Sequence, residues 1–159
     1  MLSVPDFINT CREVGLNVTY QRILIYKSLI STRSHPTAEE IYSDVKQEYP
    51  SISLATVYKT LETLAEHNLI GKVTPLHDLA RYDGDTEPHH HLVCLECRKV
   101  EDIHDPELNK IPLPRQAGFI ASGYRIQFEG ICEECRLAKE EERKRQEKTD
   151  MTFCGKSKN

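Results

Sequence analysis

Residues 89–102 read His89-His90-His91-Leu92-Val93-Cys94-Leu95-Glu96-Cys97-Arg98-Lys99-Val100-Glu101-Asp102, and two kinds of metal ligand fall within this stretch. Cys94 and Cys97 form a C-x-x-C, whereas His89 and His91 form an H-x-H that Asp102 follows. Thiolates suit zinc, while imidazole with carboxylate suits iron, manganese or zinc. One ion is not expected to use all of these ligands, so the stretch predicts two separate metal sites.

A second C-x-x-C, formed by Cys132 and Cys135, completes one of these sites. Each pair lies on a predicted tight turn that makes its two sulfurs converge, and two such turns form a closed tetrahedral zinc site. Two disulfides, or four unrelated buried cysteines, are the alternative interpretations. Paired C-x-x-C motifs in a chain without a secretion signal favour zinc. Cys11 and Cys154 have no partner at ligand spacing, and we assign them no role.

The second predicted site combines histidines and aspartates. His89 and His91 would project from the same face of a strand. Asp102 falls on the adjacent predicted strand, Asp83 lies just upstream, and His35 could reach across from the first half of the chain. A surface position is the alternative for each residue taken alone. The four other histidines are expected at the surface, as polar side chains usually are: His67, His77, His90 and His104.

Composition limits the cellular setting. The chain of 159 residues has no apolar run of about 18 residues, so no membrane partner is expected. Residues 1–6 lack the basic and apolar layout of a signal peptide, which favours a cytoplasmic protein. The net charge of −4 argues weakly against nucleic-acid binding. However, the acidic excess is concentrated in residues 76–135, where 12 acidic residues face 6 basic ones around the predicted metal ligands.

The first half predicts four short helices, over residues 6–13, 20–30, 37–48 and 54–67, followed by a hairpin formed by residues 69–74 and 80–82. Thr19 and Ser53 are predicted N-caps, and Thr37 with Glu40 forms a capping box. This order is typical of a winged helix-turn-helix, in which the helix before the wing enters the DNA major groove. A small helical bundle that packs on another element is the alternative.

The outward face of the predicted helix 54–67 carries small polar residues and one lysine, which allow close approach to DNA. The residues expected at DNA are Arg22, Ala55, Thr56, Tyr58 and Lys59.

The second half predicts a small α/β domain. Residues 83–88 are a turn-rich acidic hinge. Predicted strands cover residues 91–94, 99–103 and 124–129, with a weak helix over residues 106–116. A charged run over residues 139–148 predicts a frayed helix and then a disordered tail. The expected fold class is therefore α+β, with a winged-helix domain (1–82), a hinge (83–88), a metal-binding dimerisation domain (89–137) and a tail (138–159).

Taken together, the motifs resemble the ferric uptake regulator (Fur) family over about residues 5–137. The matching segments are Thr19-Tyr20-Gln21-Arg22, His35-Pro36-Thr37-Ala38-Glu39-Glu40-Ile41-Tyr42, Ser53-Leu54-Ala55-Thr56-Val57-Tyr58-Lys59-Thr60-Leu61, Arg81-Tyr82-Asp83, His89-x-His91-Leu92-x-Cys94-x-x-Cys97, Val100-x-Asp102 and Cys132-x-x-Cys135.

This resemblance implies a homodimeric, metal-responsive repressor that is not an enzyme and that binds a palindromic double-stranded DNA operator. It also implies structural Zn²⁺ at the four cysteines and a regulatory Fe²⁺ or Mn²⁺ bound by His35, Asp83, His89, His91 and Asp102.

Aspartate at position 102 is typical of the peroxide-sensing PerR-type branch of the family, where iron sensors usually carry glutamate. By that analogy, Fe²⁺ and hydrogen peroxide convert His35 or His89 to 2-oxo-histidine and repression ends, whereas Mn²⁺ supports DNA binding without this chemistry. Glu101, next to Asp102, leaves another carboxylate choice open. Iron-, zinc- or manganese-responsive uptake regulators are the nearer alternatives. A zinc hydrolase is a distant one, since no nucleophile motif accompanies the ligands.

The chain departs from the family pattern in two places. Tyr20 stands where proline is common, which should change only the entry into the helix. An additional metal site of some members needs histidine and acidic ligands near positions 88, 90, 109 and 125. This chain has Pro88, His90, Asn109 and Arg125 there, so we predict that the site is absent.

Overall fold

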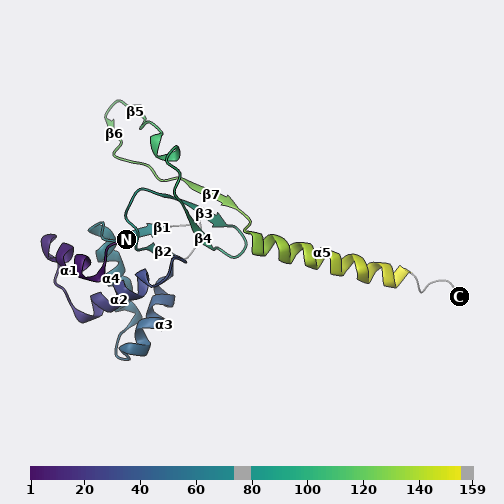
Figure 1. Ribbon diagram of the computed structural model, residues 1–159, viewed down its shortest axis with the longest axis horizontal. Helices are drawn as coiled ribbons and strands as arrows, with labels where there is room; N and C mark the ends of the chain where they lie inside the picture. Colours follow the sequence, from purple (N-terminus) through teal and green to yellow (C-terminus); the bar gives the residue numbers. More distant parts are fainter. Residues whose placement is uncertain (74–79, 155–159) are drawn as a thin grey trace.

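The computed structural model describes residues 1–73 and 80–154. Its first part contains four helices and a two-stranded hairpin: α1 (Val4–Glu13), α2 (Tyr20–Ile30), α3 (Ala38–Glu48), α4 (Leu54–Glu66), β1 (Gly71–Val73) and β2 (Arg81–Asp83). The helices form one cluster, and the hairpin lies between this cluster and the rest of the chain (Figure 1). This is the helix–hairpin order that the sequence predicts.

Each of the four helices begins at a serine or threonine whose side chain accepts a hydrogen bond from a backbone N–H three residues later. The predicted caps Thr19 and Ser53 are among them. The capping box is also present, since the Thr37 N–H donates to Glu40 Oε2 at 2.7 Å while Glu40 N–H donates to Thr37 Oγ1. These local bonds satisfy backbone donors that would otherwise lack a partner, which is why the helix starts can be read from sequence.

The first part of the chain contains the main hydrophobic core. Phe7 of α1 stacks on Tyr26 of α2 with ring centroids 3.8 Å apart, and both side chains are fully buried. Val57, Leu61 and Leu64 of α4 are buried against the same core. The apolar stripe of α4 therefore faces inward as predicted, and its polar face remains outside.

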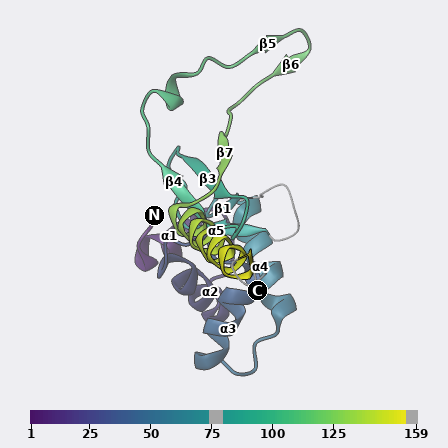
Figure 2. The same ribbon diagram turned by 90° about the vertical axis from the view of Figure 1, so that its right-hand side faces the viewer.

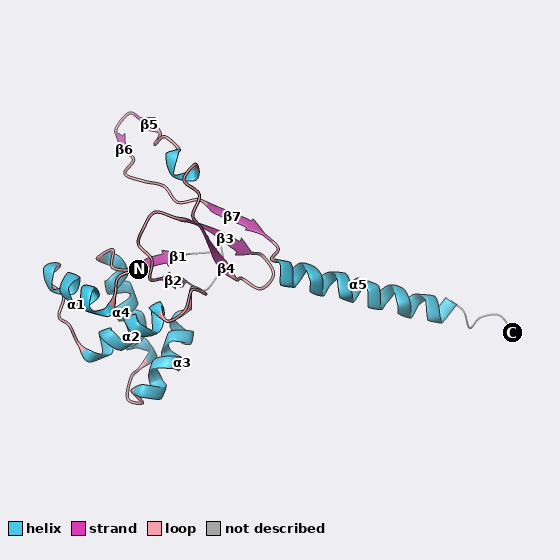
Figure 3. Cartoon of the chain, viewed as in Figure 1, coloured by secondary structure: helices cyan, strands magenta, loops and turns pink. Residues whose placement is uncertain are grey.

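The second part forms a small three-stranded sheet in the order β4-β3-β7, from β3 (His90–Cys94), β4 (Val100–Ile103) and β7 (Gln127–Gly130). β3 pairs with β4 in antiparallel and with β7 in parallel orientation. A short 3₁₀ helix, η1 (Leu108–Lys110), and a hairpin of β5 (Arg115–Gln116) and β6 (Phe119–Ile120) extend from the sheet (Figure 1). Helices make up most of the first part, and the strands of the sheet lie beside them (Figure 3).

The second core is very small, because its buried cluster consists of Val93 and Val100 of the sheet together with Val73 of β1. Large apolar side chains remain exposed along this part, including Ile120 with 94% and Phe119 with 69% of their surface accessible. A domain with so little buried apolar surface needs further stabilisation from metal binding or association.

Several predicted elements differ from the structure. The weak helix expected over residues 106–116 is limited to η1, because Pro112 and Pro114 cannot continue a helix. The last sheet strand begins at Gln127 rather than at residue 124.

The charged run over residues 139–148 is helical, as predicted. The tail expected to be disordered differs, because α5 (Glu133–Cys154) continues to residue 154; residues 155–159 lie outside the described part. This helix projects away from both parts (Figures 1 and 2). Its glutamate, lysine and arginine residues are strong helix formers, and Arg136 pairs with Glu140 at 2.7 Å one turn later. Among the described residues, no helix combines the length and the apolar character needed to cross a membrane.

Candidate metal centres and nucleic-acid interface

The first site brings together the four cysteines of the two C-x-x-C motifs. Cys94 ends β3, Cys97 follows in the adjoining turn, Cys132 precedes α5 and Cys135 lies in its first turn. One sulfur from each residue lies within 4.8 Å of all the others. Cys97 Sγ and Cys132 Sγ are 3.7 Å apart, too far for a disulfide but suitable for ligands of one ion.

Backbone hydrogen bonds fix the chain around the four sulfurs. Two backbone hydrogen bonds hold the turn after β3: the Leu95 N–H donates to the Gly130 carbonyl at the end of β7, and the Arg98 N–H donates to the Cys94 carbonyl. The N–H of Cys132 donates to Cys94 Sγ and is the main cause that lowers the pKa of Cys94 to about 6. Hydrogen bonding with the Cys132 and Cys97 thiols raises the pKa of Cys135 to about 12. Four neighbouring thiols can all be ionised only if a cation balances their negative charge. Zinc, which binds four thiolates in structural sites, is such a cation.

The second site combines residues from both parts of the chain. His35 comes from the loop before α3, Asp83 ends β2, His89 directly precedes β3, and His91 in β3 faces Asp102 in β4 in the strand register. One ligand atom from each of the five lies within 4.8 Å of all the others. Four of the five are buried, and the Asp102 side chain is 19% exposed. The structure therefore brings together the complete predicted set.

Short separations within the cluster show that the atoms converge on one point. His35 Nε2 lies 2.8 Å from Asp102 Oδ1, and His89 Nε2 lies 2.8 Å from Asp83 Oδ2. Nevertheless, both His35 Nε2 and Asp102 Oδ1 lack a partner with hydrogen-bond geometry among the described residues. Buried polar atoms that point together without bonding fit a shared cation.

The tautomer of His89 supports the same conclusion. Its Nδ1 lies 2.7 Å from the Glu87 carbonyl oxygen, which can only accept a hydrogen bond. The proton is therefore on Nδ1, and the Nε2 lone pair faces the cluster. A backbone carbonyl that orients a histidine in this way is typical of metal sites. The donor set of three imidazoles and two carboxylates suits iron, manganese or zinc.

Without a cation, the acidic and basic groups of the cluster shift each other's pKa. Burial raises the pKa of Asp83, but the neighbouring His35 and His91 imidazoles outweigh it and hold this pKa far below its ordinary value. Burial lowers the pKa of His35, whereas the nearby Asp83 and Asp102 carboxylates raise it by a larger amount, so that the net shift is an increase. The cluster thus favours positive charge between its carboxylates.

Arg81 contacts the backbone of the predicted ligand His35 and was not singled out as a functional residue from the sequence. Its Nη1 donates to the His35 carbonyl at 2.8 Å, and the Tyr82 N–H donates to the Pro36 carbonyl at 3.0 Å. His35 has a φ of +51°, in the left-handed region that non-glycine residues rarely adopt. Wing strand β2 therefore holds the His35 loop directly. The only sequence signal was the place of Arg81 in the Arg81-Tyr82-Asp83 motif.

The predicted DNA-contacting residues lie mostly on the outer side of α4. Ala55 and Lys59 are exposed, Thr56 is partly buried, and Tyr58 is 36% exposed. The Tyr58 hydroxyl donates to a Glu39 carboxylate oxygen of α3, a contact that the sequence did not indicate. Arg22 is partly buried in α2 and donates to the Asn17 carbonyl.

One histidine prediction is wrong. His90 is only 2% exposed, because it points to the opposite side of β3 from the ligand histidines and stacks on Tyr124. His67 and His104 are exposed as expected, and His77 lies outside the described residues. Cys11 is buried in the main core.

The sequence profile of the ferric uptake regulator family matches residues 13–129. The peroxide-responsive repressor PerR of Staphylococcus epidermidis is 34% identical over 135 residues, which cover 84% of this chain and 90% of the relative. Among solved structures, the Campylobacter jejuni peroxide stress regulator has a TM-score of 0.59 at 30% identity, with 85% of this chain and all of that chain covered. The Helicobacter pylori ferric uptake regulator has a TM-score of 0.69 at 22% identity, with 85% and 95% covered, and shows the shared fold.

The helices, the wing and the two ligand clusters define a metal-dependent transcriptional repressor. More specifically, the chain belongs to the ferric uptake regulator family.

Proposed function

We propose that this repressor senses hydrogen peroxide through oxidation of a histidine ligand, with His35, Asp83, His89, His91 and Asp102 as the regulatory site for Fe²⁺ or Mn²⁺. The observation that carries the proposal is the convergence of these five ligands from the helical part, the wing and the sheet. A relative at 34% identity is named as a peroxide-responsive repressor, which supports this branch over an iron-, zinc- or manganese-responsive uptake regulator and over a zinc hydrolase.

The proposed mechanism uses ligands on both sides of a hinge. His35 and Asp83 belong to the first part of the chain, whereas His89, His91 and Asp102 belong to the sheet part. Because all five serve one site, they restrict the angle between the two parts around residues 84–88. An ion that prefers this arrangement shifts the population toward it. In a homodimer, the angle sets the spacing of the two α4 helices against the half-sites of a palindromic operator.

Fe²⁺ held by these five residues would supply the redox chemistry that activates hydrogen peroxide. His35 or His89 would provide the oxidisable group: overall, one imidazole and one hydrogen peroxide would give one 2-oxo-imidazole and one water, with a net gain of one oxygen atom at C2 of the ring. The product, 2-oxo-histidine, is a poor ligand, so the two parts of the chain are no longer held together. His35 and His89 are buried, so an oxidant formed between them would meet their rings before it reached the solvent.

We assign structural Zn²⁺ to Cys94, Cys97, Cys132 and Cys135. Zinc there would join β3 to the start of α5 and compensate for the small core of the sheet part. Residues 89–137 would form the dimerisation domain, and their exposed apolar side chains offer a surface for the second subunit.

We further assign DNA contacts to Arg22, Ala55, Thr56, Tyr58 and Lys59. The exposed outer face of α4 and its position directly before the wing support this assignment.

The test loads the full chain with zinc and Fe²⁺ without oxygen, adds hydrogen peroxide, and measures operator binding together with the mass of peptides that contain His35 or His89. We expect loss of binding and the addition of one oxygen atom to one of these peptides. The Mn²⁺-loaded protein is the matched control and should keep both its mass and its DNA affinity.

An Asp102→Glu variant separates peroxide sensing from metal sensing, and we expect it to retain metal-dependent DNA binding with a weaker peroxide response. If the Fe²⁺-loaded wild type keeps its full DNA affinity and an unmodified mass after peroxide, the peroxide proposal is wrong and a metal-responsive regulator replaces it.

A further inference from the structure

Tyr58 projects from the outer side of α4, and its hydroxyl is bonded to another helix. The hydroxyl donates to Oε1 of Glu39, which lies in the first turn of α3. Tyr58 remains 36% exposed, and Ala55, the exposed residue one turn earlier on α4, is small. A molecule that approaches α4 from outside can therefore reach the Tyr58 oxygen, although the hydroxyl proton is already engaged.

The charge of Glu39 fixes the direction of this hydrogen bond. The bond from Tyr58 is the main cause that lowers the pKa of Glu39 below its ordinary value, and the same bond raises the pKa of Tyr58. Unpaired N–H groups in the first turn of a helix also favour a carboxylate anion. At neutral pH an ionised Glu39 can only accept a hydrogen bond, so Tyr58 must be the donor.

The groups around this pair do not compete for the proton of Tyr58. Oε2 of Glu39 is shielded from solvent and has no partner among the described residues, so this oxygen does not face DNA. Glu62, one turn after Tyr58 on α4, is held by the wing. It accepts from Lys72 Nζ at 2.8 Å and from the Tyr82 hydroxyl at 3.4 Å. Within the described part of the chain, no group donates to the Tyr58 oxygen, so its lone pairs remain available to a ligand.

An oxygen that can only accept hydrogen bonds distinguishes the bases by the groups that they expose in the major groove. Adenine N6 and cytosine N4 carry amino donors, whereas guanine O6 and N7 and thymine O4 are acceptors. The Tyr58 oxygen would gain a hydrogen bond from an amino group and be repelled by a keto oxygen. A tyrosine whose proton is not engaged could turn it toward either kind of group and would discriminate less.

We propose that Glu39 determines base specificity, because it engages the proton of Tyr58 and so makes Tyr58 accept from the amino group of an adenine or cytosine in the major groove. This inference rests on the proposed DNA contact of Tyr58 and adds the residue that controls it. Glu39 touches no base and is a positioning residue.

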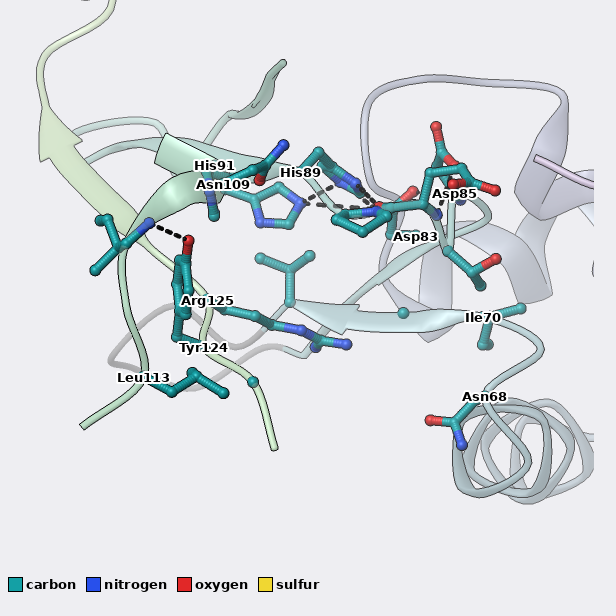
Figure 4. Close-up of a pocket in the computed structure, with 18 residues that line it drawn as sticks. Asn68, Ile70, Asp83, Asp85, His89, His91, Asn109, Leu113, Tyr124 and Arg125 are labelled. Atoms are coloured by element: carbon teal, nitrogen blue, oxygen red, sulfur yellow. Dashed lines mark hydrogen bonds and ion pairs between the residues drawn. The ribbon is translucent and has the colours of Figure 1, made fainter. Parts of the chain in front are cut away.

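The start of α3 is attached to the metal site, which links the position of Glu39 to the metal-bound state. The loop that carries His35 leads directly into α3. His35 Nε2 lies 3.7 Å from Asp83 Oδ2, and Asp83 in turn faces His89 and His91 (Figure 4). The Mn²⁺-loaded protein is therefore the state in which this contact should be tested.

The test selects operators from a library of random DNA duplexes with the full chain loaded with zinc and Mn²⁺. In the selected duplex, single adenines or cytosines are then replaced by purine or pyrimidin-2-one, which lack the amino group. For the wild type, removal of one particular amino group in each half-site should weaken binding about threefold to tenfold, because one hydrogen bond is lost. Tyr58→Phe should bind the natural and the modified duplex with equal affinity.

Glu39→Gln keeps the size of the side chain, but its amide can accept from Tyr58 or donate to it, so the proton is no longer fixed. At the position that depends on Tyr58, this variant should discriminate between an amino group and a keto oxygen about threefold less than the wild type. Glu48→Gln is the matched control, because Glu48 accepts from the exposed Tyr20 hydroxyl at 2.7 Å and neither residue belongs to α4. It should keep the wild-type base preference.

Wild-type base preference in Glu39→Gln would overturn this inference alone and leave the DNA contact of Tyr58 intact. A position that depends on Tyr58 but is sensitive only to replacement of thymine by uracil would also overturn it, since Tyr58 would then contact a methyl group. Equal binding of every duplex by Tyr58→Phe and the wild type, or equal losses on all of them, would refute the DNA contact of Tyr58 as well. Selection of no sequence by the wild type would refute operator binding itself and, with it, this inference.

Discussion

Arg81→Met should weaken regulatory metal binding without removing any ligand. Arg81 is 16% exposed, and its Nη1 donates to the His35 carbonyl at 2.8 Å while lying 3.6 Å from Glu40 Oε2. Methionine keeps much of the side-chain volume but cannot donate. Loss of a hydrogen bond from a charged donor costs about 1.5–3 kcal/mol.

This cost should be observed as a loss of metal affinity. Without the bond, the His35 loop can relax from its φ of +51° in the metal-free protein, and metal binding must restore it. Since about 1.4 kcal/mol corresponds to a tenfold change, we expect an affinity about ten to a hundred times lower.

The assay is a titration with Mn²⁺ in which the free ion is measured by electron paramagnetic resonance, together with zinc content. Zinc content should match that of the wild type, because the four cysteines lie at the other end of the sheet part. Arg33→Met, at an exposed arginine of the same loop, is the matched control and should bind Mn²⁺ normally. Wild-type Mn²⁺ affinity in Arg81→Met would refute the reasoning, and a parallel loss of zinc would show general unfolding instead.

Three further predictions concern stability. Cys97→Ser should lower zinc content and remove hydrogen-exchange protection from the sheet part, while α1–α4 stay protected by their own core; equal loss in both parts would contradict this. Phe7→Ala should destabilise the helical part by about 3–5 kcal/mol, measured by denaturant unfolding, because a fully buried ring is removed. In the metal-free protein, the pKa of Asp83 lies far below its ordinary 3.8, so its stabilising effect is present above that value and lost as the pH falls. Acid titration of the metal-free protein should show this loss of stability, and the loss should be smaller in Asp83→Asn.

Local chemistry made much of the first part predictable. Thr19, Thr37 and Ser53 mark their helix starts because each cap bonds to a backbone N–H three residues away. The apolar period of α4 likewise predicts its buried face, since helical spacing alone determines which residues share a side. By contrast, the extended strand expected from residue 124 starts at Gln127, because pairing with β3 sets its limits.

For the sites, the sequence by itself determined the ligand types and their grouping into two sets. The four cysteines can be recognised from their spacing within two predicted turns. The H-x-H and the aspartate opposite it can likewise be recognised from spacing within one short segment. Only the tertiary structure decided that His35 lies 2.8 Å from Asp102, that Arg81 holds the His35 loop, and that His90 is buried against Tyr124. These contacts join residues far apart in the chain. Their geometry depends on how the helical and sheet parts pack, which no local pattern of residues encodes.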